Sequence, residues 1–113
     1  LAYYWGDSAR LIRAYPSRIG YLHLKQVEPD LLADVLKNEI SFVDAVVQGV
    51  MVEPPLGVPE YNEVLLEAAT ANPGIFAIIE QDMYPVGDFS LPLPIARRTR
   101  EYIESLDAPA RFR

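Results

Sequence analysis

The sequence IGYLHLK at residues 19–25 decides the fold of this chain, and IFAIIEQD at residues 75–82 has the same pattern. Each stretch is apolar on both faces of an extended strand and then ends in two polar residues two positions apart. These are His23 and Lys25 in the first stretch and Glu80 and Asp82 in the second. Strands of this kind are typical of a buried parallel sheet. The sequence therefore predicts a site at the carboxyl ends of parallel strands, where an imidazole and a carboxylate can converge on a metal ion.

Helical patterns alternate with the strand patterns along the chain. Strands are expected at 19–25, 50–52 and 75–81, and apolar periodicity predicts helices at about 8–15, from 29 or 30 onward, from about 41 to 48, at about 60–71 and at about 94–106. A proline-rich loop separates the second strand from the helix that follows it. Strands that alternate with helices in this way indicate an α/β fold with parallel strands joined by crossovers.

The composition is that of a folded domain and argues against several other classes of protein. Half of the 113 residues are hydrophobic, which is too many for a disordered chain. The net charge is −6 and the ten basic residues form no sustained patch, so we expect no nucleic-acid partner. No apolar run reaches the roughly 18 residues needed to span a bilayer, so no membrane partner is expected. The absence of cysteine fits a cytoplasmic protein.

The first residues, LAYYW at 1–5, include no initiator methionine and are dense in aromatic side chains. Such a start is typical of an interior segment whose packing partner lies upstream. The sequence therefore predicts a fragment of a longer protein.

Four short motifs resemble one known family. They are HLKQ at 23–26, GV at 49–50, LG at 56–57 before a helix, and IEQD at 79–82. Together they are similar to the late strands and loops of the sugar isomerase/epimerase family, which has the xylose-isomerase-like TIM barrel fold and includes the inosose dehydratases. The resemblance implies that residues 1–113 form the C-terminal part of a single TIM barrel domain whose N-terminal part is absent. The chain would then hold the last three βα units of a (β/α)8 barrel, with parallel strands and flanking helices.

The resemblance also assigns roles to residues. The family's metal-binding histidine falls on His23 and its final metal-binding glutamate on Glu80, while its other two ligands lie on earlier strands. The metal would be Mn²⁺, Co²⁺, Mg²⁺, Fe²⁺ or Zn²⁺, and Glu80 would also be catalytic, because metal-bound glutamates move the proton in this family. A metal-stabilised enediolate of a sugar or cyclitol leads to isomerisation, epimerisation or dehydration. The implied role is that of an isomerase, epimerase or lyase in carbohydrate or inositol metabolism.

Two positions depart from the family pattern. Gln26 stands where the dehydratases usually carry aspartate, which argues against that particular reaction. The sequence VPE at 58–60 replaces a glycine-containing turn, which predicts an altered loop over the site.

Lys25 and Asp82 are the predicted substrate-binding residues. Lys25 would donate to a substrate hydroxyl or oxyanion, and Asp82 would orient Lys25 or a hydroxyl. The plainer alternatives are that Lys25 ends a strand in water and that Asp82 caps the following loop. For Glu53, at the end of the middle strand, a solvated loop position is the simpler interpretation.

Two other functions compete with the metal enzyme. A stand-alone, non-catalytic α/β module that binds a partner or assembles as a homo-oligomer through its open sheet edges would explain the short length. An endonuclease on the same barrel is disfavoured by the acidic charge. We expect the 113-residue chain alone to be inactive and poorly stable, because half of the metal ligands and the neighbours of its apolar faces would be missing.

Overall fold

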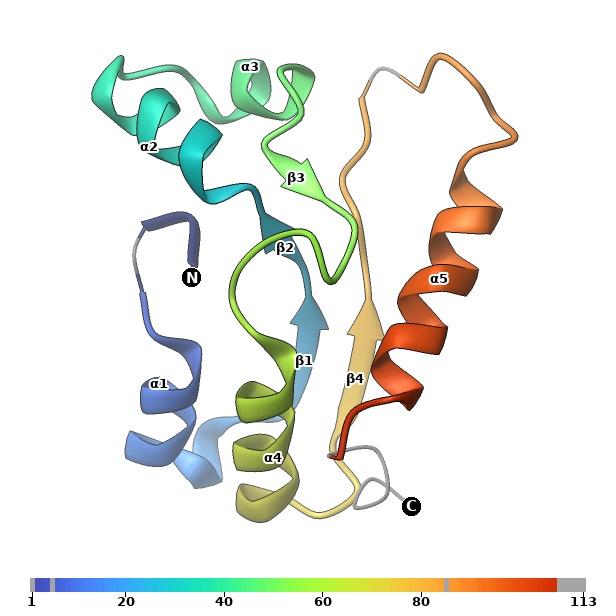
Figure 1. The fold of residues 1–113 in the computed structure, drawn as a ribbon. Helices are drawn as coiled ribbons and strands as arrows, with labels where there is room; N and C mark the ends of the chain where they lie inside the picture. The colour runs from blue at the N-terminus through green and yellow to red at the C-terminus, as the bar shows by residue number, and fades with distance from the viewer. Residues whose placement is uncertain (1, 5, 85, 108–113) are drawn as a thin grey trace.

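The computed structural model of the chain describes residues 2–4, 6–84 and 86–107 (Figure 1). Leu1 and Trp5, and the end of the predicted 1–113 domain, lie outside these described residues. The elements are η1 (Ala2–Tyr4), α1 (Ser8–Ala14), η2 (Pro16–Arg18), β1 (Tyr21–Leu24), β2 (Gln26–Val27), α2 (Pro29–Lys37), α3 (Phe42–Val47), β3 (Met51–Val52), α4 (Tyr61–Ala71), β4 (Phe76–Ile79) and α5 (Pro92–Glu104). None of the helices in the described part combines the length and apolar character needed to cross a membrane.

The two strands that decide the fold are neighbours. β1 pairs with β4 in parallel, with Tyr21 opposite Phe76 and His23 opposite Ile78. In Figure 1, α1 and α4 lie side by side next to β1, and α5 runs beside β4. The chain is thus a mixed α/β structure, and the prediction that the strands at 19–25 and 75–81 are parallel is confirmed.

The middle strand differs from its prediction. The expectation of three parallel strands is wrong, because β3 pairs antiparallel with β2 in a separate two-stranded sheet and does not join the sheet of β1 and β4. The physical reason lies in the residues after β1. Gln26 and Val27 continue the extended chain, and their backbone N–H and C=O groups need hydrogen-bond partners. The short β3 and the loop at Val58 provide these partners. The described residues therefore contain two parallel strands of a sheet, and their membership of a barrel stays a prediction.

The first four α-helices begin close to where the sequence signals predicted. Asp7 caps α1 by accepting the Arg10 amide at 2.8 Å, and Ser41 caps α3 by accepting the Asp44 amide. Gly49 follows α3 with φ of +89°, the left-handed conformation expected of a helix-terminating glycine. The last helix begins two residues before its predicted start.

The core lies between the sheet and the helices on one of its faces. Leu22 and Leu24 point to this face, and the buried helix side chains pack against them. A second core joins β2 to α2 and α3. The buried residues of the three core clusters are Val27, Leu32, Val35, Ala45 and Val50; Ile12, Val64, Ala68 and Ile75; and Leu24, Tyr61 and Leu65.

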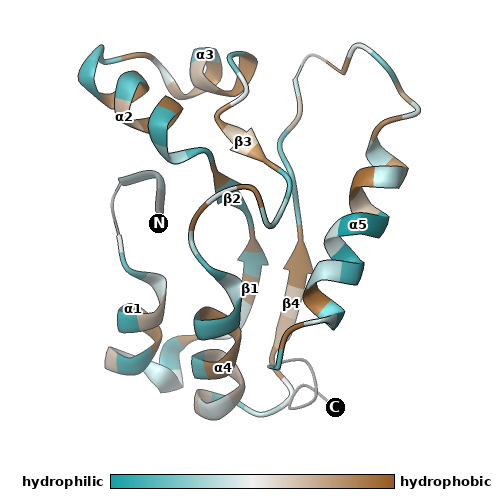
Figure 2. Ribbon diagram, in the orientation of Figure 1, coloured by the Kyte–Doolittle hydropathy of each residue, from teal (hydrophilic) through white to brown (hydrophobic). Residues whose placement is uncertain are grey.

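β4 is exposed although its sequence is that of a buried strand. Figure 2 shows it as a strongly hydrophobic strand, yet all four of its residues are exposed, with Phe76 at 77% and Ile79 at 42%. Side chains alternate along the strand, so both of its faces lack cover. The apolar sequence of β4 predicted a buried strand, but no element among the described residues covers it.

Candidate functional site

His23 and Glu80 meet at the carboxyl ends of the two parallel strands. His23 lies in β1, and Glu80 follows β4 directly, where its amide donates to the Leu24 carbonyl at 3.1 Å and so continues the strand pairing. This backbone contact places the Glu80 side chain beside the imidazole. His23 Nδ1 lies 2.5 Å from Glu80 Oε2. The structure thus brings the two predicted ligands into direct contact.

Lys25 links the carboxylate of Asp82 to that of Glu80. Its ammonium Nζ lies 3.0 Å from Glu80 Oε1 and donates to Asp82 Oδ2 at 2.9 Å. His23, Glu80, Lys25 and Asp82 therefore form a continuous chain of polar contacts, called the strand-end cluster below. All four residues that the sequence singled out belong to it.

The charges of the strand-end cluster stabilise one another. The hydrogen bond to Asp82, and then the one to Glu80, raises the pKa of Lys25. Hydrogen bonds from Lys25 and then His23 lower the pKa of Glu80. At neutral pH the lysine is therefore an ammonium and Glu80 a carboxylate, which is the form that accepts a proton or binds a cation.

The cluster is open to solvent. The side chains of His23, Glu80, Lys25 and Asp82 are 46%, 37%, 33% and 31% exposed. Since none of the four is buried, a small molecule or ion can reach each of them.

The His23 and Glu80 side chains suit a divalent cation as part of its coordination sphere. His23 Nδ1 and Glu80 Oε2 lie in direct contact with each other, and an imidazole nitrogen with a carboxylate oxygen is a donor pair used by Zn²⁺, Mn²⁺, Fe²⁺ and Co²⁺. The described residues contain no group of three or more histidine, aspartate, glutamate or cysteine side chains able to hold a metal. The pair would therefore contribute at most two ligands to a metal site, and any further ligands would have to be water or donors outside the described residues.

Tyr21 and Gln26 are residues near the site that the sequence analysis did not assign to it. The ring centre of Tyr21 lies 5.5 Å from that of His23 on the same strand. Tyr21 could have been predicted from its position two residues before His23, because residues two apart share one face of a strand. Gln26, which the analysis noted only as a departure from the family, is buried and shapes the neighbouring loop.

Gln26 holds the proline-rich loop beside the site. Its side-chain Nε2 donates to the Pro59 carbonyl at 2.8 Å, and its Oε1 accepts the Gly57 amide at 3.1 Å. A Cβ at Gly57 would lie 2.4 Å from the Val27 carbonyl oxygen, so only glycine fits there. The predicted altered loop is thus a segment pinned to β2.

Glu53 is neither at the site nor free in solvent. It makes a two-bonded ion pair with Arg98 of α5, with the shorter contact at 2.8 Å. The prediction of a loop position is confirmed, but the side chain is ion-paired and only 20% exposed, because α5 packs close enough for its arginine to reach the end of β3.

A hollow of about 270 Å³ lies next to the strand-end cluster. Its lining consists of one face of α3 and the residues that follow β4: Phe42, Val43, Val46, Asp82, Met83 and Tyr84. Asp82 belongs to both the cluster and this hollow, so a molecule held by the cluster has an apolar wall on that side.

The chain is similar to inosose dehydratases and to a rhizopine catabolism protein. It is 30% identical over 93 residues to an inosose dehydratase of Bacillus thuringiensis, covering 82% of this chain and 30% of that protein. It is 29% identical over 100 residues to an inosose dehydratase of Geobacillus kaustophilus, covering 88% of this chain and 32% of that protein. It is 28% identical over 112 residues to the rhizopine catabolism protein MocC of Rhizobium meliloti, covering 99% of this chain and 34% of that protein.

The chain spans about a third of the length of these curated relatives. No family model matches it. No solved structure matches it either. The similarity therefore supports an inosose-dehydratase-like segment, and the broader sugar isomerase/epimerase assignment stays a prediction.

Proposed function

We propose that this chain carries part of the active site of a divalent-metal-dependent enzyme that acts on a sugar or cyclitol. The observation that carries the proposal is the contact between His23 Nδ1 and Glu80 Oε2 at the ends of adjacent parallel strands. Among dehydration, isomerisation and epimerisation, the names of the relatives favour dehydration of an inosose-type ketone, whereas Gln26 at the dehydratases' usual aspartate position argues against it. Their limited coverage leaves the other two reactions as alternatives.

His23 and Glu80 would hold the metal. When bound, a divalent cation supplies a Lewis acid that draws charge from a carbonyl oxygen and so acidifies the neighbouring C–H bond. The imidazole must be neutral and the carboxylate ionised to act as ligands. The lowered pKa of Glu80 meets the second condition at neutral pH.

Glu80 would also move the proton. Its carboxylate takes the proton from the carbon next to the carbonyl, and the C–H electron pair becomes the double bond of an enediolate. In dehydration, the enediolate expels the hydroxyl of the next carbon, which leaves as water once it receives a proton. The hydrogen bonds that keep Glu80 ionised also make it a weaker base. Displacement of Lys25 from Glu80 by the substrate would restore that basicity.

Lys25 and Asp82 would bind the substrate. The ammonium is held between two carboxylates and can turn one of its three hydrogens to a substrate oxygen as negative charge develops there. Asp82 keeps Lys25 in place and has a second oxygen for a substrate hydroxyl.

Metal titration of the 113-residue chain, once circular dichroism has shown that the chain and each variant are folded, tests the proposal without any substrate. Mn²⁺ or Co²⁺ binding should weaken at least about tenfold in His23→Ala and in Glu80→Ala. Glu63→Ala is the matched control, because Glu63 pairs with Arg13 on the helices instead. In the full enzyme, both site variants should lose turnover while keeping the circular dichroism of the wild type. Retained metal affinity and turnover in both would refute the proposal.

A non-catalytic assembly module is the second candidate, and the exposed apolar surface of β4 favours it. Its discriminating measurement is solution mass with and without a chelator. A stable oligomer that is indifferent to chelator and binds no metal would favour assembly over catalysis.

A further inference from the structure

Part of the apolar side of α3 lies outside the core. Ala45 is the buried residue of this helix and belongs to the core that joins α2, α3 and β2. Phe42 and Val43, by contrast, are 49% and 65% exposed. Successive residues of a helix are about 100° apart, so Phe42, Val43 and Val46 fall on one side of α3, next to Ala45. These three residues are called the α3 stripe below.

The α3 stripe is one wall of the hollow of about 270 Å³, and the chain that follows β4 is the other. Figure 1 shows this segment running up past α3. Met83 and Tyr84 line the hollow from that side, and Tyr84 is 68% exposed. Among the described residues that line the hollow, Asp82 alone carries a charge. The hollow is thus an apolar slot that touches the strand-end cluster through Asp82.

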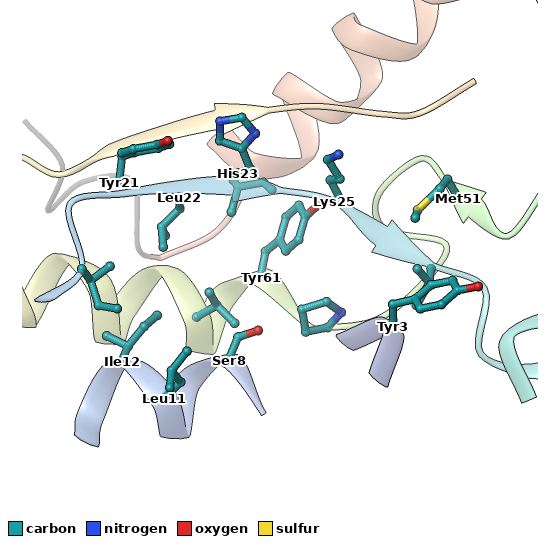
Figure 3. A pocket seen from close by; sticks show the side chains of 15 residues that line it. Tyr3, Ser8, Leu11, Ile12, Tyr21, Leu22, His23, Lys25, Met51 and Tyr61 are labelled. Carbon is teal, nitrogen blue, oxygen red and sulfur yellow. The ribbon is translucent and has the colours of Figure 1, made fainter. Parts of the chain in front are cut away.

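Asp82 fixes where the hollow lies relative to the cluster. Its Oδ2 accepts a hydrogen bond from Lys25 at 2.9 Å. Figure 3 shows His23 and Lys25 on one face of β1 and Leu22 on the other, toward α1 and α4. A ligand in contact with the cluster therefore lies on the face of His23 and Lys25, and Asp82 leads from that ligand into the hollow.

The lining of the hollow decides which part of a ligand fits there. Only Asp82 and Tyr84 of the described lining residues carry a side-chain oxygen, so a ligand hydroxyl placed in the hollow would lose water with few partners to replace it. An alkyl group has no such loss and gains about fourfold in affinity for each CH₂ that it buries. The hollow has room for several carbons, since a water molecule takes about 30 Å³.

We propose that the hollow is a subsite for a small alkyl substituent, such as an alkyl ether, on the sugar or cyclitol ring that the strand-end cluster binds. This inference rests on the proposed function, because the cluster has to hold the ring. The occupant follows from continuity: Asp82 binds a ring hydroxyl and also lines the hollow, so a substituent on the neighbouring ring carbon reaches the α3 stripe. The α3 stripe would then determine specificity between plain and alkylated rings.

A second copy of the chain is the competing occupant, and its charge opposes it. Each chain carries a net charge of −6, so two copies repel each other. Asp44 lies in the first turn of α3 and Asp82 in the lining of the hollow, so two copies that met there would bring like charges together.

Nuclear magnetic resonance titration of the folded 113-residue chain in the presence of Zn²⁺ tests the inference. The probes are myo-inositol and its mono-O-propyl ethers, one for each ring position. We expect at least one ether to bind at least about tenfold more tightly than myo-inositol, with nuclear Overhauser contacts from its propyl group to Val43, Val46 and Met83. Equal affinities of myo-inositol and every ether would overturn the inference alone, since shifts at His23 and Lys25 would still show binding at the cluster. If no probe binds, the inference is wrong whatever the metal titration shows.

Val43→Ala and Val47→Ala are matched variants of the same helix. Both valines are exposed, so neither change should unfold the chain, but only Val43 is among the residues that line the hollow. Val43→Ala should reduce the preference for the ether over myo-inositol at least about twofold, whereas Val47→Ala should not change it. An equal effect of the two variants would contradict the subsite. Shifts of Val43 and Met83 that depend on protein concentration without any probe would show that a second copy occupies the hollow instead.

Discussion

Lys25 and Asp82 are joined by a hydrogen bond of 2.9 Å between residues 57 positions apart in the sequence. This bond, more than the contact with Glu80, raises the pKa of Lys25. Asp82 is thus the main hydrogen-bond partner of the Lys25 ammonium within the strand-end cluster.

Replacing Asp82 by asparagine should therefore lower the pKa of Lys25 toward that of a free lysine. The carboxylate charge is lost while the size of the side chain is kept, so the change reports the electrostatic contribution. Nuclear magnetic resonance titration of the Lys25 side chain measures the pKa directly. Asp88→Asn is the control, since Asp88 accepts hydrogen bonds from Ser90 and not from Lys25. An unchanged Lys25 pKa in Asp82→Asn would contradict the assigned bond.

The contacts of Glu80 with Lys25 and His23 should make the free energy of unfolding depend on pH in the acidic range. The pKa of Glu80 is lowered by folding, so its stabilising effect is present above the ordinary glutamate value of 4.5 and is lost as the pH falls through the folded pKa. Urea unfolding of the wild type and Glu80→Gln should differ more at pH 6 than at a pH well below 4.5, so that the two stabilities converge as the pH falls. Glu39→Gln, at an exposed turn, should show no such convergence. A constant difference between wild type and Glu80→Gln at both pH values would refute the expectation.

The packing and hydrogen bonds that hold the proline-rich loop to β2 predict how much stability is lost when either is disturbed. Gly57→Ala should destabilise the fold by about 2 kcal/mol or more, because the new methyl group has to displace the Val27 carbonyl. Gln26→Leu should cost about 1–3 kcal/mol, because the Gly57 amide and the Pro59 carbonyl lose their buried partner. Chemical denaturation measures both. Gly87→Ala, where no atom lies near the new Cβ, is the control.

Phe76 and Leu65 are both large apolar residues inside regular elements, but only Leu65 is buried. Phe76 is 77% exposed, so Phe76→Ser should change the free energy of unfolding by no more than about 1 kcal/mol and should reduce self-association. Leu65 is buried, so Leu65→Ala should cost about 2–5 kcal/mol. Chemical denaturation measures the stability of both variants, and light scattering measures the self-association of Phe76→Ser. A large loss of monomer stability in Phe76→Ser would mean that β4 is covered in solution.

The sequence by itself determined most of the local structure and singled out the four residues that meet in the strand-end cluster. Caps such as Asp7 and Ser41 and the glycine after α3 act through neighbours a few residues away, so their effect can be read from short patterns. The spacing of two in each strand placed His23 with Lys25 and Glu80 with Asp82 because side chains alternate along any extended chain.

Only the tertiary structure decided which strands pair and which contacts form between them. A two-residue segment such as Met51–Val52 carries too little pattern to specify its partner, and it paired with β2 because unsatisfied backbone groups lay there. The contact of Glu53 with Arg98 and the burial of Gln26 likewise depend on segments that are 45 and 31–33 residues apart. Such contacts arise from the packing of whole elements, and no local spacing of residues encodes them.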